Sequence, residues 1–314
     1  MFDLLALFVL GAPDSGGLVA GEVEVVAEGF QFTEGPVWLP SEGLIFSDIP
    51  ADTIYRADKS VFRQPSGQSN GLIVDARGRL IACEHRNRRV TRTEKDGTVT
   101  VLADRFEGKR FNSPNDAVAA ADGAVYFTDP PYGLEGGLKG PNAELDFCGV
   151  FRVDASGEVR ALARDFKKPN GIALSPDGKT LYVADTEGGH VRAFDVAEDG
   201  SLRNDRVFFK VFSPDGMAVD ARGNVWTTGG KAVTVVSPEG EQLEQIEFPH
   251  IPANCAFGDA DGMTLYVTAR TTVYKVRTGV GGKWEVGSEK WEAGSGKWAA
   301  CPHMLHTTST YVGQ

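Results

Sequence analysis

Asp177-Gly178-Lys179-Thr180-Leu181-Tyr182-Val183 is a stretch in which a tight turn leads directly into residues that favour a β-strand. Glycine accepts the positive φ that such a turn requires, and β-branched and aromatic residues pack well in sheets. Similar stretches occur at residues 42–46, 77–81, 122–127, 222–226 and 261–267. Their glycines follow one another at intervals of about 35 to 55 residues, the length of a four-stranded propeller blade. The sequence therefore predicts an all-β, six-bladed β-propeller.

The composition agrees with this fold class. The chain has 314 residues, of which 41% are hydrophobic, and it contains 38 glycines. This is enough apolar material for a sizeable core, and all-β propellers of this length form one domain. No amphipathic helical stretch separates the repeated turns, which argues against strands that alternate with helices.

The net charge of −11 limits the class of partner. A surface of that sign repels nucleic-acid phosphates and anionic lipid headgroups, so we expect no nucleic acid and no membrane partner. It suits a protein that attracts cations or handles small metabolites. The sequence does not indicate an oligomeric state.

The ends of the chain differ from the repeated part. We expect an N-terminal extension over residues 1–21, a propeller over 22–280 and an atypical C-terminal tail over 281–314 that is flexible or contacts another copy. The run Leu4–Leu10 has the size of a signal-peptide core, but no Lys or Arg precedes it. The four cysteines are scattered and read as isolated thiols. We therefore expect a cytoplasmic protein, with a periplasmic or secreted one as the alternative.

A second regularity accompanies the turns. A polar residue stands eight positions before each turn glycine, and nine before the first; the six are Glu34, Asn70, Asn115, Asn170, Asp215 and Asn254. Because the first strand of each blade lines the central channel, these side chains should form a ring at one mouth. Asn and Gly also mark ordinary turns, but turns require neither Glu34 nor Asp215. Oxygen ligands of this kind suit a hard divalent cation.

The second strand of each blade returns toward the same mouth, and its end also carries polar residues. They are Asp48, Glu84, His85, Asp129, Asp185, Thr186, Thr228 and Arg270. They could form an outer wall of the pocket, and His85 is the best candidate for substrate contact. No H-E-x-x-H spacing occurs, so a zinc site built on imidazoles is not indicated.

The ends of the repeated part should pair with each other. Val23–Val26 alternates before the first inner strand and would complete the last blade beside Thr272–Val276. Such pairing removes open sheet edges. In the tail, Trp284, Trp291 and Trp298 recur every seven residues, but the intervening glycines oppose a helix.

Several phrases of the chain resemble those of one known family. They are Thr33-Glu34-Gly35-Pro36-Val37-Trp38, Ser113-Pro114-Asn115-Asp116, Phe127-Thr128-Asp129-Pro130-Pro131-Tyr132-Gly133, Pro169-Asn170-Gly171-Ile172 and Pro214-Asp215-Gly216-Met217. The family contains gluconolactonases, senescence marker protein (regucalcin) and luciferin-regenerating enzyme, and the chain is most similar to its bacterial gluconolactonases. The resemblance implies a propeller with a metal at the channel mouth, held by Glu34, Asn170 and Asp215. It also implies that Asn115 contacts the substrate or the metal.

The expected activity is the metal-dependent hydrolysis of a sugar lactone. The metal would polarise the carbonyl, Asp215 is the candidate general base, and Glu34 would chiefly neutralise the metal. Asn70, Asn115, His85 and Asn254 are the candidate substrate contacts. Oxygen ligation favours Ca²⁺, with Zn²⁺, Mn²⁺ and Mg²⁺ as alternatives. The alternative functions are a phosphotriesterase-like hydrolase and a non-catalytic calcium- or ligand-binding propeller.

Overall fold

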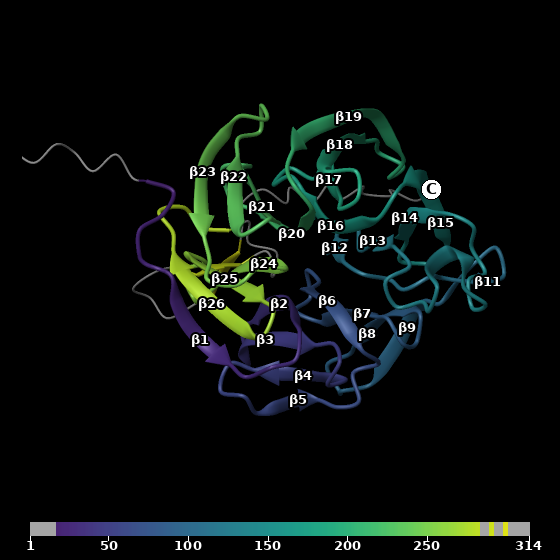
Figure 1. The fold of residues 1–314 in the computed structure, drawn as a ribbon, viewed down its shortest axis with the longest axis horizontal. Coiled ribbons are helices and arrows are strands. Elements are labelled where there is room, and N and C mark those ends of the chain that lie inside the picture. Colours follow the sequence, from purple (N-terminus) through teal and green to yellow (C-terminus); the bar gives the residue numbers. More distant parts are fainter. Residues whose placement is uncertain (1–16, 283–288, 292–297, 301–314) are drawn as a thin grey trace, which may run out of the picture.

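The fold is a ring of six four-stranded antiparallel sheets around a central axis (Figure 1). The computed structural model describes residues 17–282, 289–291 and 298–300. Each sheet is a blade whose first strand lies innermost, and the chain moves from blade to blade around the ring. The predicted six-bladed, all-β propeller is confirmed.

The first three blades follow the chain order. Blade 1 contains β2 (Thr33–Leu39), β3 (Gly43–Asp48), β4 (Thr53–Arg56) and β5 (Val61–Arg63). Blade 2 contains β6 (Ser69–Val74), β7 (Leu80–Glu84), β8 (Arg89–Thr93) and β9 (Val99–Ala103). Blade 3 contains β12 (Ala117–Ala119), β13 (Val125–Asp129), β14 (Cys148–Val153) and β15 (Val159–Phe166). The short strands β10 (Arg105–Phe106) and β11 (Lys109–Arg110) pair between blades 2 and 3, and the 3₁₀ turn η1 (Gly137–Lys139) lies between β13 and β14.

The last three blades complete the ring. Blade 4 contains β16 (Pro169–Leu174), β17 (Thr180–Asp185), β18 (His190–Val196) and β19 (Leu202–Lys210). Blade 5 contains β20 (Pro214–Val219), β21 (Val225–Gly229), β22 (Ala232–Val236) and β23 (Gln242–Glu247). Blade 6 contains β24 (Asn254–Gly258), β25 (Thr264–Ala269), β26 (Thr272–Arg277) and, as its outer strand, β1 (Glu24–Glu28).

The pairing of β1 with β26 closes the ring. Glu24 lies opposite Lys275 and Glu28 opposite Thr272, so the first and last strands of the propeller share one sheet (Figure 1). This is the predicted closure, and it leaves neither end of the propeller as an isolated blade. Val19 adds one more bridge, to Thr278.

The turns between the first and second strands of the blades explain the glycine repeat. All six repeat glycines have positive φ; they are Gly43, Gly78, Gly123, Gly178, Gly223 and Gly262. A side chain in this region costs about 1 to 2 kcal/mol, which is why glycine recurs here.

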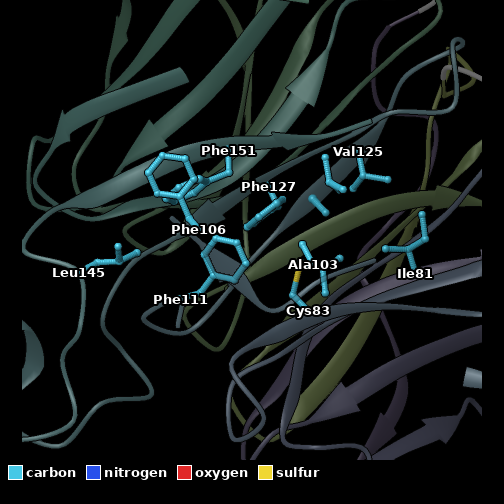
Figure 2. Packing of buried hydrophobic residues seen from close by; sticks show 12 residues of the cluster. Ile81, Cys83, Ala103, Phe106, Phe111, Val125, Phe127, Leu145 and Phe151 are labelled. Atoms are coloured by element: carbon cyan, nitrogen blue, oxygen red, sulfur yellow. The ribbon is translucent and has the colours of Figure 1, made fainter. Parts of the chain in front are cut away.

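The hydrophobic core lies between neighbouring blades. Between blades 2 and 3, Phe127 stacks on Phe151 with ring centroids 5.5 Å apart, and Phe111 meets both rings edge to face (Figure 2). Each aromatic pair contributes roughly 0.5 to 1.5 kcal/mol beyond its buried area. Because the same packing joins each blade to the next, the inner strands are held in a fixed register.

Some sequence features fall at or beyond the limits of the described residues. Leu4–Leu10, Trp284 and Cys301 lie outside them, whereas Trp291 pairs with Trp298 where β27 (Glu289–Trp291) meets β28 (Trp298–Ala300). Cys83, Cys148 and Cys255 are buried and free. Within the described ranges, no helix is long and apolar enough to cross a membrane.

Candidate functional site

The six predicted ring residues lie at the same end of the six inner strands. Glu34, Asn70, Asn170, Asp215 and Asn254 are in β2, β6, β16, β20 and β24, and Asn115 lies two residues before β12. Asp215 is half-buried and the other five are buried. The Asn254 amide of blade 6 donates a hydrogen bond of 3.3 Å to Asp116 of blade 3, so side chains from opposite blades meet across the channel.

Glycines directly after the ring residues allow this convergence. A Cβ on Gly171 would overlap the Asp215 carbonyl oxygen of the next blade, and one on Gly216 would overlap the Asn254 side chain. Gly35 and Gly71 occupy the equivalent position in blades 1 and 2. Glycine therefore stands where the backbone of one blade needs to approach the ring residue of the next.

Hydroxyl groups on the second strands fix the spacing between blades. Thr128 Oγ1 donates to the Asn170 carbonyl oxygen at 2.7 Å, and Ser47 Oγ donates to that of Asn70 at 2.9 Å. In blades 4 and 5, Thr186 and Thr228 bind the carbonyl oxygens of Pro214 and Ala253 in the same way. The inner strands of blades 2, 4, 5 and 6 are thus held from the preceding blade at the ring residue or directly next to it, and Thr186 and Thr228 have this structural role at the predicted wall.

Three carboxyl groups, of which Glu34 and Asp116 are buried and Asp215 is half-buried, repel one another in the ring. Burial, and then the charges of Asp215 and Asp116, raise the pKa of Glu34 well above its usual value. Burial, and then Asp116, raise the pKa of Asp215 to about 7, while the Asn170 side chain and Arg270 lower it. Burial also raises the pKa of Asp116 to about 7. The ring therefore concentrates negative charge that a bound cation would relieve.

Asp116 is the site residue that the sequence analysis missed. It follows the ring residue Asn115, at the position that glycine occupies in blades 1, 2, 4 and 5. Its Oδ1 accepts the Ala117 amide and its Oδ2 accepts the Asn254 amide. The sequence does contain a signal for it, because a carboxylate stands at the position where these four blades have glycine, the residue that lets the next blade approach.

The ring amides differ in which atoms remain free. Asn170 Nδ2 donates to Thr186 Oγ1 at 3.1 Å, which leaves its Oδ1 available to a ligand. Asn254 uses both ends of its amide, since its Oδ1 accepts the Cys255 backbone N–H at 2.8 Å. Asn254 therefore connects the carboxylates to the backbone, and its substrate contact stays a prediction.

Asn70 and His85 form one unit at the mouth. Asn70 Nδ2 lies 3.2 Å from His85 Nε2, and burial lowers the pKa of His85 to about 4, so the imidazole is neutral at pH 7. The Oδ1 of Asn70 is buried without a hydrogen-bond partner. A buried acceptor of this kind is expected to have a ligand, water or ion as its partner.

The acidic residues at the ends of the second strands are occupied by the fold. Asp48 accepts the backbone N–H groups of Gln31 and Phe32, and Asp185 accepts those of Lys167 and Lys168. Asp129 accepts the Asn112 N–H at 2.7 Å. Glu84 binds Thr91, Arg89 and Asn87. These contacts give the four carboxylates a structural role at the predicted pocket wall.

Two more predicted wall residues remain near the ring. The Arg270 guanidinium lies 5.3 Å from the centre of the Phe32 ring, and its charge lowers the pKa of Asp215. His85 packs near Gly133, because a Cβ added at Gly133 would lie 3.2 Å from the His85 Cβ. Both residues could therefore reach a ligand bound at Asp215 or Asn70.

Beyond the ring, the channel continues as a largely apolar cavity of about 160 Å³. Asp116 and Asn254 contribute polar side chains to its wall, and the rest of the lining includes Val37, Leu72, Ile172, Leu174 and Met217. Of the three carboxyl groups, Asp116 is the one that lines this cavity. These largely non-polar surroundings agree with the burial that raises the pKa of Asp116.

The donor set fits a hard cation. Among the described residues, no three His, Cys, Asp or Glu side chains are grouped closely enough to hold a metal by themselves. A cation at the ring would therefore need amide oxygens beside the carboxylates, and Asn70 and Asn170 each have one that is free of protein partners. Mixed carboxylate and amide oxygens suit Ca²⁺ better than the softer metals.

The fold and site define a propeller with an acidic, amide-rich ring at one channel mouth. The SMP-30/Gluconolactonase/LRE-like family matches residues 32–271, a range that includes all six ring residues. The chain belongs to this family, as the resemblance predicted.

Individual relatives agree with the family match. A gluconolactonase of Zymomonas mobilis is 33% identical over 293 residues, which cover 83% of this chain and 82% of the relative. The solved structure of a gluconolactonase of Xanthomonas campestris is 34% identical and has a TM-score of 0.76, covering 84% of this chain and 92% of the other. A pentonolactonase of Haloferax volcanii is 28% identical, covering 78% of this chain and 83% of the relative.

Proposed function

We propose that this protein is a lactonase that hydrolyses a sugar lactone at the ring-bearing mouth of the channel. The observation that carries the proposal is the group of three carboxyl groups, two buried and one half-buried, beside the free amide oxygens of Asn70 and Asn170. The family match and the similarity to a gluconolactonase and a pentonolactonase support the substrate class.

Glu34, Asn170 and Asp215 would hold one divalent cation, with Asn115 as a further contact to the cation or the substrate. Ca²⁺ is the preferred ion for these oxygen donors. When bound, the cation would polarise the lactone carbonyl and stabilise negative charge on its oxygen. The Thr186 hydroxyl holds the Asn170 amide in the orientation that this role requires.

Asp215 is the proposed general base. It is half-buried, and its pKa is about 7 in the metal-free protein. A bound cation would lower this pKa, so the group would be a carboxylate that can accept a proton at neutral pH. The carboxylate would take a proton from the water that attacks the carbonyl carbon. As the ring C–O bond breaks, the same proton would pass to the departing alkoxide, which yields the hydroxy acid.

Hydrolysis of D-glucono-1,5-lactone, followed with a pH indicator, tests this function. Chelator-stripped protein should be inactive, and one of Ca²⁺, Zn²⁺, Mn²⁺ or Mg²⁺ should restore turnover. Asp215→Asn should lower kcat by about 100-fold or more, in the range typical of general-base loss. Full turnover in this variant with metal present would refute the base assignment.

A parallel assay separates the alternative functions. Paraoxon hydrolysis without lactone hydrolysis would indicate a phosphotriesterase-like enzyme. Metal binding without turnover of either substrate would indicate a binding propeller.

A further inference from the structure

Asn70 is held in the ring by both neighbouring blades. Ser47 Oγ of blade 1 donates to the Asn70 carbonyl oxygen at 2.9 Å. The next residue, Gly71, donates its N–H to the Asn115 carbonyl oxygen, on the segment that leads into blade 3, at 2.8 Å. The fold therefore fixes the backbone from which the Asn70 side chain extends.

His85 has an equally fixed place beside Asn70. β6 pairs with β7, and His85, directly after β7, donates its N–H to the Gln68 carbonyl oxygen, directly before β6, at 3.2 Å. Gly133 packs against it, since a Cβ added there would lie 3.2 Å from the His85 Cβ. The imidazole is buried, so it has little freedom to turn away from Asn70.

The hydrogen bond between the two side chains sets the orientation of the Asn70 amide. Asn70 Nδ2 lies 3.2 Å from His85 Nε2. An amide nitrogen only donates, so His85 Nε2 accepts and the neutral imidazole carries its proton on Nδ1. The amide nitrogen thus points at His85, and the amide oxygen points away from it. That oxygen is buried and has no hydrogen-bond partner among the residues that the structure describes.

The free oxygen of Asn70 calls for a hydrogen-bond donor. Asn170, whose amide oxygen is also free of protein partners, is already a proposed cation ligand together with Glu34 and Asp215. A sugar lactone donates through its hydroxyl groups, since its ester oxygens only accept. A substrate hydroxyl is therefore a suitable partner for the Asn70 oxygen.

We propose that Asn70 is a specificity-determining residue whose side-chain oxygen accepts a hydrogen bond from a hydroxyl group of the bound lactone, and that His85 is the positioning residue that fixes this amide. The proposal rests on the lactonase function and names a feature of its substrate, a hydroxyl group outside the reacting ester. A site built to bind a substrate hydroxyl discriminates strongly against an analogue that lacks it.

Asn70→Leu and His85→Phe test the two roles with two substrates. Each change should raise KM for D-glucono-1,5-lactone about 10-fold, as expected for one lost hydrogen bond. For δ-valerolactone, which has no hydroxyl groups, kcat/KM should stay within about 2-fold. His85→Gln keeps an acceptor for Asn70 Nδ2, so it should restore most of the loss. His190→Phe is the matched control, because the His190 ring donates to the local Gly188 carbonyl oxygen at 2.9 Å and neither substrate should respond.

The double variant Asn70→Leu/His85→Phe separates positioning from an independent contact. Because His85 acts through Asn70, the double variant should have the KM of Asn70→Leu alone, and additive increases would overturn the positioning role. Equal losses of kcat/KM for both lactones would mean a structural role and overturn the substrate contact. Weaker Ca²⁺ binding by Asn70→Leu in a calorimetric titration would also overturn it, because Asn70 would then be a cation ligand.

The His85 tautomer tests the amide orientation without any turnover. In a nitrogen NMR spectrum of the wild type at neutral pH, the His85 signal, assigned by its loss in His85→Gln, should show the proton on Nδ1. A proton on Nε2 would mean that the amide oxygen faces His85, which overturns the proposal. If the wild type hydrolyses neither lactone, the proposed function fails, and calorimetric binding of D-gluconate tests the contact. Weaker binding by Asn70→Leu would then support it, whereas equal binding, or none by the wild type, would overturn it.

Discussion

At the residue scale, the site depends on which side chain stands beside each ring residue. Where glycine follows the ring residue, the next blade can approach closely; where Asp116 follows Asn115, a third carboxylate enters the channel. A single residue at this position therefore decides whether the next blade can approach closely or the channel receives another carboxylate.

Gly171→Ala should destabilise the protein more than Gly178→Ala. A Cβ at position 171 would overlap the Asp215 carbonyl oxygen, and relieving the overlap would require a shift of the backbone. We therefore expect the free energy of unfolding to fall by more than about 2 kcal/mol. Gly178 has positive φ and open space where a Cβ would lie, so only strain of about 1 to 2 kcal/mol applies. Urea unfolding of both variants measures the difference, and equal losses would contradict the close-approach role of Gly171.

His85 should make the protein less stable in acid. Burial lowers the pKa of His85 from 6.5 to about 4. Between pH 6.5 and pH 4, His85 is therefore protonated in the unfolded chain but neutral in the folded protein. Its contribution to stability is therefore present above pH 6.5 and is lost as the pH falls toward 4, by up to about 1.4 kcal/mol per pH unit.

His85→Gln removes this titration and keeps a neutral side chain. The free energy of unfolding of the wild type should therefore fall more than that of the variant between about pH 7 and pH 5. Parallel pH dependences for the two proteins would mean that the imidazole is not held neutral by the fold.

At the element scale, the second strands act as spacers for the inner ones. The hydroxyl groups of Ser47, Thr128, Thr186 and Thr228 each bind a backbone carbonyl of the following blade. These hydrogen bonds fix the backbone at or next to the ring residue relative to the preceding blade.

Thr128→Val should lower stability by about 1 to 3 kcal/mol, because it leaves the buried Asn170 carbonyl without this partner. It should also weaken divalent-cation binding, since Asn170 is a proposed ligand. Thr53→Val is the control, because the Thr53 hydroxyl binds only the local Ala51 carbonyl. Calorimetric titration of both variants with Ca²⁺ would show the effect, and equal affinities would argue against the spacer role.

The sequence was sufficient to predict elements that depend on local chemistry. The six turns, the ring position and the pairing of the chain ends all follow from repeated glycine and polar residues. The roles of Asp48, Asp129 and Asp185 could not be predicted, because their backbone partners come from a loop that tertiary structure brings near. The same holds for Asn254 and Asp116, which meet only across the closed ring.

At the scale of the whole molecule, the ring couples all six blades at one point. The three raised carboxyl pKa values mean that the fold brings mutually repelling groups together in a poorly solvated place. A cation bound there would favour the closed propeller over the unfolded chain, by an amount that grows with its concentration. Lactone turnover and the free energy of unfolding should therefore both rise with the concentration of the bound cation.

The most direct test of the proposed cation site is a calorimetric titration of chelator-stripped protein with Ca²⁺, performed on the wild type, Glu34→Gln and Asp215→Asn. The wild-type chain should bind one cation, and each variant should bind it at least about 10-fold more weakly, as loss of a charged ligand implies. Unchanged affinity in both folded variants, or no binding of Ca²⁺, Zn²⁺, Mn²⁺ or Mg²⁺ by the wild type, would contradict the proposed site.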